Sequence, residues 1–139
     1  MSAPPRILVL CTGNSCRSQM AEAYLRHFAQ GRAEVYSAGV EAHGLNPRAV
    51  LAMRMDGLDI GHHTSKTVDQ LPPVPFTHII TVCDNARERC PYLPGHAHRT
   101  HHSFTDPARA TGTEAEVMAV FVQVRDEIKE WCKGWVAEM

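Results

Sequence analysis

The sequence predicts one α/β domain over residues 1–139, a three-layer sandwich in which helices cover both faces of a four-stranded parallel sheet. Short apolar runs rich in branched residues alternate with segments of helical periodicity, a pattern typical of a buried parallel sheet. A chain of 139 residues is long enough for a single hydrophobic core, and no internal repeat or linker divides it.

The first part of the chain supplies two strands and the helix between them. Residues 6–10 form an apolar run that predicts a buried strand, and residues 19–28 have the composition of a helix. Gly31 is expected to cap that helix. Residues 33–38 predict the second strand, which ends at Gly39.

The next segment supplies a second helix and a long connection. Asn46 and Pro47 are typical of a helix start, because Asn caps the free N–H groups and Pro fits the first helical position. This helix is expected over residues 48–56. Residues 58–66 are predicted to be irregular, and residues 67–71 to form a short helical turn.

The last part of the chain completes the sheet and ends in a long helix. Residues 77–83 are rich in branched side chains and predict a third buried strand, and residues 98–104 predict a short fourth strand. Thr113 and Glu116 have the spacing of a capping box. The helix that follows carries an apolar stripe and is expected to reach about Trp135.

The composition limits the classes of function. Hydrophobic residues make up 44% of the chain, charged residues 21%, and the net charge is −1, which argues against a general basic field for nucleic acid. Without an apolar run of membrane-spanning length or a signal peptide, we expect a cytoplasmic monomer that contacts no membrane. In that reducing compartment, redox, catalytic or metal chemistry is the expected role of the five cysteines, Cys11, Cys16, Cys83, Cys90 and Cys132.

The loop of residues 11–18 joins the first strand to the first helix and has the composition of an oxyanion cradle. Its N–H groups can converge on a tetrahedral anion at the positive end of the helix dipole. Gly13 permits a sharp turn, Arg17 can hold two anion oxygens, and Cys11 lies beneath the anion as a nucleophile. We expect Arg17 to favour the thiolate of Cys11, and Ser18 to donate a hydrogen bond to it. The predicted oxyanion-binding residues are Thr12, Gly13, Asn14, Ser15, Cys16, Arg17 and Ser18.

These residues carry a resemblance to a known family. The spacing Cys-x5-Arg-Ser matches the phosphate loop of the low-molecular-weight protein tyrosine phosphatases, and the longer string from Cys11 to Glu22 resembles the arsenate reductases built on that fold. The pattern Val-Cys-x6-Cys-Pro around Cys83 and Cys90 is similar to that of the thioredoxin-coupled arsenate reductases. The likeness covers nearly the whole chain, including residues 36–39, 43–47, 63–65, 106–108 and 124–129.

The resemblance implies a strand order of 2-1-3-4 and the reduction of arsenate to arsenite. Cys11 would be the nucleophile, Arg17 would bind the oxyanion, and Asp106, in an Asp-Pro turn, would be the general acid. Cys11, Cys83 and Cys90 would form a disulfide cascade, recycled by reduced thioredoxin without a tightly bound cofactor. Adjacent strands lie about 4.8 Å apart, within the range of disulfide Cα separations of about 4.4–6.8 Å, so a modest movement could join Cys11 to Cys83.

We also expect a set of supporting residues behind the loop. They are Ser18, Glu22, Ser37 and His63. Some relatives bind a monovalent cation near residues matching Asn14, Glu22 and Ser37, where a further aspartate matches the position of Lys66. A lysine at that position argues against the cation or replaces its charge. Cys16 is expected either to pack as a bystander or to protect Cys11, and Cys132 to be structural.

Three other interpretations stay open. A zinc site could be formed by Cys83, Cys90, His96, His98, His101 and His102. These residues do not have the usual spacing of zinc ligands, and the preferred interpretation has no metal. A tyrosine phosphatase would use Cys11, Arg17 and Asp106 but would leave the cysteine pair without a role, and weak phosphatase activity is expected in either case. A non-enzymatic oxyanion sensor would tolerate the loss of Cys11 or Asp106.

Overall fold

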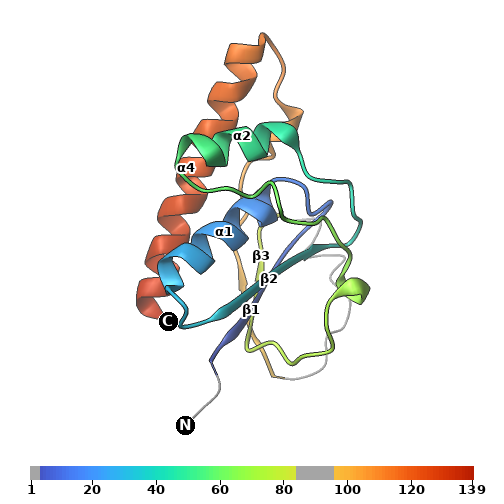
Figure 1. Cartoon of the computed structure of the whole chain (residues 1–139), viewed down its shortest axis with the longest axis vertical. Coiled ribbons are helices and arrows are strands. Elements are labelled where there is room, and N and C mark those ends of the chain that lie inside the picture. Colours follow the sequence, from blue (N-terminus) through green and yellow to red (C-terminus); the bar gives the residue numbers. More distant parts are fainter. Residues whose placement is uncertain (1–3, 84–95) are drawn as a thin grey trace.

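The structure is a computed structural model, in which residues 4–83 and 96–139 are described. Within these ranges the chain forms a parallel sheet in the order β2-β1-β3-β4 (Figure 1), as predicted. The strands are β1 (Arg6–Cys11), β2 (Glu34–Gly39), β3 (His78–Thr81) and β4 (His98–His101). Since β1 and β3 are neighbours, the segments that follow their carboxyl ends meet at one edge of the sheet.

Helices α1 (Arg17–Ala29), α2 (Pro47–Met55) and α4 (Glu114–Glu138) pack together beside the sheet (Figure 1). Ser37 of β2 bonds to Glu22 of α1, and His78 of β3 contacts Trp135 of α4. The strand register and the alternation of side chains put Ser37 and His78 on the same face, so α1 and α4 cover one face of the sheet. Tyr36 faces the other side, where its ring contacts Phe76.

The core is centred on β1. Ile7, Leu8, Val9 and Leu10 are all fully buried, which means that both faces of the central strand are covered. The apolar stripe predicted for the last helix is confirmed on α4, where the buried residues include Val117, Phe121, Val124, Ile128, Cys132 and Val136. Within residues 4–83 and 96–139, no helix is both long and apolar enough to span a membrane.

Several helix boundaries differ from the sequence prediction. Helix α1 begins two residues early, at Arg17, because the carbonyl of Cys16 already accepts the N–H of Met20. The predicted cap at Gly31 is wrong, since Gln30 is the C-cap in a left-handed conformation and Gly31 follows it. Helix α4 extends past Trp135 to Glu138.

The third and fourth strands are shorter at their carboxyl ends than predicted, whereas β1 and β2 each end one residue later. β3 stops at Thr81 rather than at residue 83, and β4 stops at His101 rather than at residue 104. Backbone pairing continues more loosely beyond them, because the N–H of Phe104 donates to the carbonyl of Val82 at 3.1 Å. The predicted helix start at Asn46 is confirmed: its side chain accepts hydrogen bonds from the backbone N–H groups at 48 and 49. The predicted turn at 67–71 is confirmed as the 3-10 helix η1 (Val68–Gln70).

Candidate active site

The loop between β1 and α1 is held by hydrogen bonds from the neighbouring segment 40–46. N–H groups of this segment donate to loop carbonyls of Cys11, Thr12, Gly13 and Ser15, at 3.3, 2.9, 2.9 and 3.0 Å respectively. In a trans peptide the N–H points away from the carbonyl of the same unit. Fixing the carbonyls on the outer side therefore directs the loop N–H groups toward the cavity that the loop encloses, the arrangement that binds oxyanions.

Two residues of the loop have unusual backbone requirements. The prediction that Gly13 makes the sharp turn is wrong, because the left-handed residue is Asn14, with φ of 49°. Gly13 is required instead because a Cβ at this position would overlap the imidazole ring of His43. His43 thus lies directly against the loop and forms one wall of the site.

Asn14 and Ser18 orient a hydrogen bond toward the nucleophile. The side-chain amide of Asn14 donates to Oγ of Ser18 at 2.9 Å and to Oγ of Ser37 at 3.0 Å. Because Ser18 accepts from Asn14, its own proton is available for Sγ of Cys11, which lies 2.9 Å away. Ser37 in turn donates to Glu22 at 2.6 Å. The predicted support of Cys11 by Ser18 therefore has the geometry that a thiolate requires.

Gln19 connects the loop to His63. Its amide nitrogen donates to the backbone carbonyl and the side-chain oxygen of Asn14 at 3.1 and 3.0 Å, and its oxygen lies 2.9 Å from Nδ1 of His63. Burial lowers the pKa of His63, so the ring is held neutral and can donate from Nδ1 to Gln19. Sequence reasoning missed Gln19, although a glutamine in the first turn of a buried helix signals a side chain that needs buried partners.

Lys66 lies beside this network. Its ammonium donates to the carbonyls of Ser37 and Thr64 at 3.1 and 2.9 Å. Burial lowers the pKa of Lys66, and the nearby charge of Glu22 opposes that effect. The lysine therefore brings a positive charge to Asn14, Glu22 and Ser37. These are the residues near which a bound monovalent cation was considered from the sequence.

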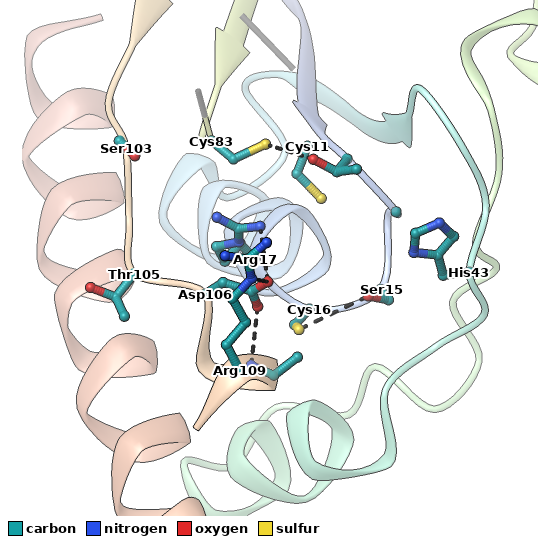
Figure 2. Close-up of a pocket in the computed structure, with 13 residues that line it drawn as sticks. Cys11, Ser15, Cys16, Arg17, His43, Cys83, Ser103, Thr105, Asp106 and Arg109 are labelled. Carbon is teal, nitrogen blue, oxygen red and sulfur yellow. Dashed lines mark hydrogen bonds and ion pairs between the residues drawn. The ribbon is translucent and has the colours of Figure 1, made fainter. Parts of the chain in front are cut away.

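A cavity of about 700 Å³ lies over the loop. Figure 2 shows it between the loop, the end of β3 and the segment that leads to α4. Among the described residues, its lining consists of Cys11, Thr12, Gly13, Ser15, Cys16, Arg17, His43, Cys83, Ser103, Thr105, Asp106, Ala108 and Arg109. This lining contains no Tyr, Phe or Trp side chain that could grip an aryl group.

Arg17 and Asp106 lie beside each other on the lining of the cavity (Figure 2). Arg17 lies 3.6 Å from Oδ2 of Asp106 and donates to the carbonyl of Phe104 at 3.1 Å. Oδ1 of Asp106 accepts the N–H of Ala108 at 3.0 Å, which caps the 3-10 helix η2 (Pro107–Arg109). The predicted Asp-Pro turn thus presents Oδ2 to the space above the loop, where a general acid is needed.

Cys83 lies on the wall of the same cavity as Cys11. The hydroxyl of Thr12 is 3.3 Å from Sγ of Cys83, and both cysteines are only 3% exposed. The predicted meeting of the first and third strands therefore brings a second thiol to the oxyanion loop. Cys90, the third cysteine of the predicted cascade, lies outside the described residues.

The two remaining described cysteines have less reactive settings. Cys16 lines the cavity, but burial and the charge of Asp106 raise the pKa of its thiol to about 11. Cys132 is fully buried on α4, and burial raises its thiol pKa strongly. Both thiols therefore stay protonated near neutral pH and are poor nucleophiles.

The histidines of the zinc interpretation are dispersed. His98 stacks on His78, His101 bonds to Thr81 at 2.7 Å, and His102 packs against Phe104. Among the residues that the structure describes, no group of three or more His, Cys, Asp or Glu side chains is arranged to hold a metal ion.

The chain belongs to the low molecular weight phosphotyrosine protein phosphatase family, which it matches over residues 6–139. It is 51% identical over 122 residues to a protein named arsenate reductase from Bacillus subtilis (strain 168), with 88% of each chain covered. An arsenate reductase from Shouchella clausii (strain KSM-K16) is 52% identical over 124 residues, also with 88% of each chain covered. A solved arsenate reductase in the phosphate binding state has a TM-score of 0.78 and 26% identity, covering 96% of this chain and 98% of that one. The predicted family and fold class are confirmed.

Proposed function

We propose that this protein reduces arsenate to arsenite through Cys11 and a disulfide cascade, with thioredoxin as the electron donor. The observation that carries the proposal is the contact of Cys83 with Thr12 of the oxyanion loop. A phosphatase needs only the nucleophile, the arginine and the acid, whereas a reductase needs a second thiol at the same cavity. The relatives named arsenate reductase, about half identical to this chain, support the same function.

In the first step arsenate enters the cradle as an analogue of phosphate. The loop N–H groups and the guanidinium of Arg17 bind its oxygens, and Ser18 stabilises the thiolate of Cys11. The thiolate attacks arsenic and forms an S–As bond. The As–O bond opposite breaks, and Asp106 protonates the departing oxygen so that it leaves as water.

In the second step the thiolate of Cys83 attacks Sγ of Cys11. The S–As bond breaks and its electron pair stays on arsenic, which is reduced from As(V) to As(III) and leaves as arsenite. The two cysteines are oxidised together to the Cys11–Cys83 disulfide. The two electrons gained by arsenic are thus the two lost by the thiols, and no further reductant is needed at this stage.

In the third step the thiolate of Cys90 attacks Sγ of Cys83. This releases the thiolate of Cys11 and leaves a Cys83–Cys90 disulfide, which the dithiol of thioredoxin reduces by exchange. Since the electrons pass through sulfur, the proposal requires no resident cofactor, and the ammonium of Lys66 supplies the charge that a monovalent cation would bring. A cytoplasmic location would provide the reduced thioredoxin.

A second activity follows from the same site. Cys11, Arg17 and Asp106 also suffice for the hydrolysis of a phosphate monoester, since water can resolve a phosphocysteine. Because the cavity lining offers no aromatic side chain to an aryl substrate, we expect this phosphatase activity to be weak.

The experiment is a coupled assay with purified protein, thioredoxin, thioredoxin reductase and NADPH. Arsenate should cause continuous NADPH oxidation, and the Cys11→Ser variant should show none while keeping the folded circular dichroism spectrum. Absence of arsenate-dependent oxidation by the parent, with phosphate ester hydrolysis intact, would favour the phosphatase instead.

A further inference from the structure

Arg109 contributes the charge at the mouth of the cavity. Its side chain lines the cavity and is 90% exposed, whereas the side chain of Arg17 on the floor is only 13% exposed. Nε of Arg109 lies 4.0 Å from Oδ2 of Asp106, the same oxygen that faces Arg17 (Figure 2). Asp106 is therefore shared between a largely buried guanidinium and an exposed one.

The charge balance of the lining gives Arg109 its importance. Apart from His43 and the thiols, the ionisable side chains among the described lining residues are Arg17, Asp106 and Arg109. In the proposed first step Cys11 is a thiolate and Asp106 carries the proton that it donates, so the charge of the thiolate offsets that of Arg17. The net positive charge that an incoming anion meets is then that of Arg109.

We propose that Arg109 is a specificity residue that captures inorganic oxyanion dianions at the mouth and passes them to Arg17. When the anion reaches the loop, the guanidinium of Arg17 turns toward the oxygens of the anion, and Arg109 stays paired with Asp106. This inference deepens the proposed function and rests on it for the identity of the substrate, although the binding of an oxyanion can be measured without turnover.

The same charge separates substrate from product. Arsenate and phosphate carry one to two negative charges near neutral pH, whereas arsenite is uncharged there. A guanidinium at the mouth of the cavity attracts the anions by Coulomb interaction and does not attract the neutral product to a comparable degree. Arg109 thus favours entry of the substrate without slowing the departure of arsenite.

The test measures the binding of inorganic phosphate by isothermal titration calorimetry to the parent and to Arg109→Gln. We expect Kd to rise about threefold to tenfold in the variant at low salt, and the two proteins to converge at high salt. Arg109→Lys should recover most of the affinity. Arg54→Gln is the matched control, because Arg54 is an exposed arginine of α2 and does not line the cavity.

A kinetic readout separates capture from simple positioning of Asp106. In Arg109→Gln, KM for arsenate should rise while kcat stays within about twofold, and inhibition by arsenite should not change. Equal phosphate affinity of parent and variant at low salt, or a loss confined to kcat, would overturn the proposal. Neither of these two results would contradict the proposed arsenate reduction. If that proposed function were wrong, the parent protein would bind phosphate but would not reduce arsenate.

Discussion

Oγ1 of Thr12 lies 3.3 Å from Sγ of Cys83, although the two residues are 71 positions apart in the sequence. Thr12 belongs to the oxyanion loop after β1, and Cys83 follows β3. The contact therefore joins the two parts of the proposed chemistry, the oxyanion cradle and the thiol that resolves the arsenic adduct.

Thr12→Val should slow arsenate reduction selectively. Valine keeps the shape of threonine but removes the hydroxyl that can stabilise a thiolate at Cys83, a hydrogen bond worth about 1 kcal/mol or roughly a fivefold change in rate. Hydrolysis of p-nitrophenyl phosphate, which does not use Cys83, should stay within about twofold of the parent. Equal losses in the two assays would show that Thr12 acts on the cradle rather than on Cys83.

Asn14→Ala should destabilise the fold more than an ordinary surface substitution. The fully buried side chain bonds to Ser18 and Ser37 and accepts the N–H of Lys66 at 2.9 Å. Its loss leaves several buried partners unsatisfied, and we expect the free energy of unfolding to fall by about 3 kcal/mol in urea titrations. Asn46→Ala, which removes only the cap of α2, should cost about 1 kcal/mol. Similar losses in the two variants would contradict the role of Asn14 as the centre of the network.

Gly13→Ala should weaken phosphate binding by at least about fivefold, because a methyl group at position 13 displaces the ring of His43 from the loop. Removing that ring in the double variant Gly13→Ala with His43→Ala should recover part of the affinity, which calorimetry would detect. Gly134→Ala is the control, since open space surrounds a Cβ at that helical position. No recovery in the double variant would mean that the loop itself, and not His43, rejects the methyl group.

Acid should destabilise the protein partly through His63. Burial lowers the pKa of His63 below its ordinary value of 6.5, so below that pH the unfolded chain binds a proton that the folded protein does not. The free energy of unfolding should then decrease as pH falls from about 6.5 and level off below the folded pKa. Among the neighbours of His63, Glu22 opposes the effect of burial by raising this pKa, whereas His62, Arg26 and Lys66 lower it further.

Urea midpoints at pH 7.5 and 5.5 provide the measurement. The parent should lose more stability between these pH values than His63→Asn, whereas His96→Asn, at an exposed histidine that is not among these neighbours, should behave like the parent. An unchanged acid sensitivity in His63→Asn would assign the effect to other groups, such as His78, whose pKa burial also lowers.

The sequence was most informative where neighbouring residues determine the structure. The apolar run at 6–10 and the loop that follows it predict the central strand, the oxyanion cradle and the nucleophile, because the chemistry and the backbone requirement lie within one segment. The Asp-Pro turn at Asp106 was predictable for the same reason.

What the sequence did not predict depends on contacts between distant segments. The wall formed by His43, the link from Gln19 to His63 and the pairing of Arg109 with Asp106 require the exact packing of side chains in the fold. The segment 43–47 was part of the resemblance to the family, but nothing in its pattern placed the ring of His43 against Gly13. The ends of the third and fourth strands were also misjudged. Residues 82 and 83 have strand propensity, but Cys83 lines the cavity instead of continuing the strand.

The most direct measurement of the central claim compares two activities in Cys83→Ser. The serine variant should form the arsenic adduct at Cys11 but release no arsenite, while it hydrolyses p-nitrophenyl phosphate at a rate close to that of the parent. Cys132→Ser, a substitution of a buried cysteine away from the cavity, should retain both activities. Arsenite release by Cys83→Ser at the parental rate would contradict the role of Cys83 as the resolving thiol.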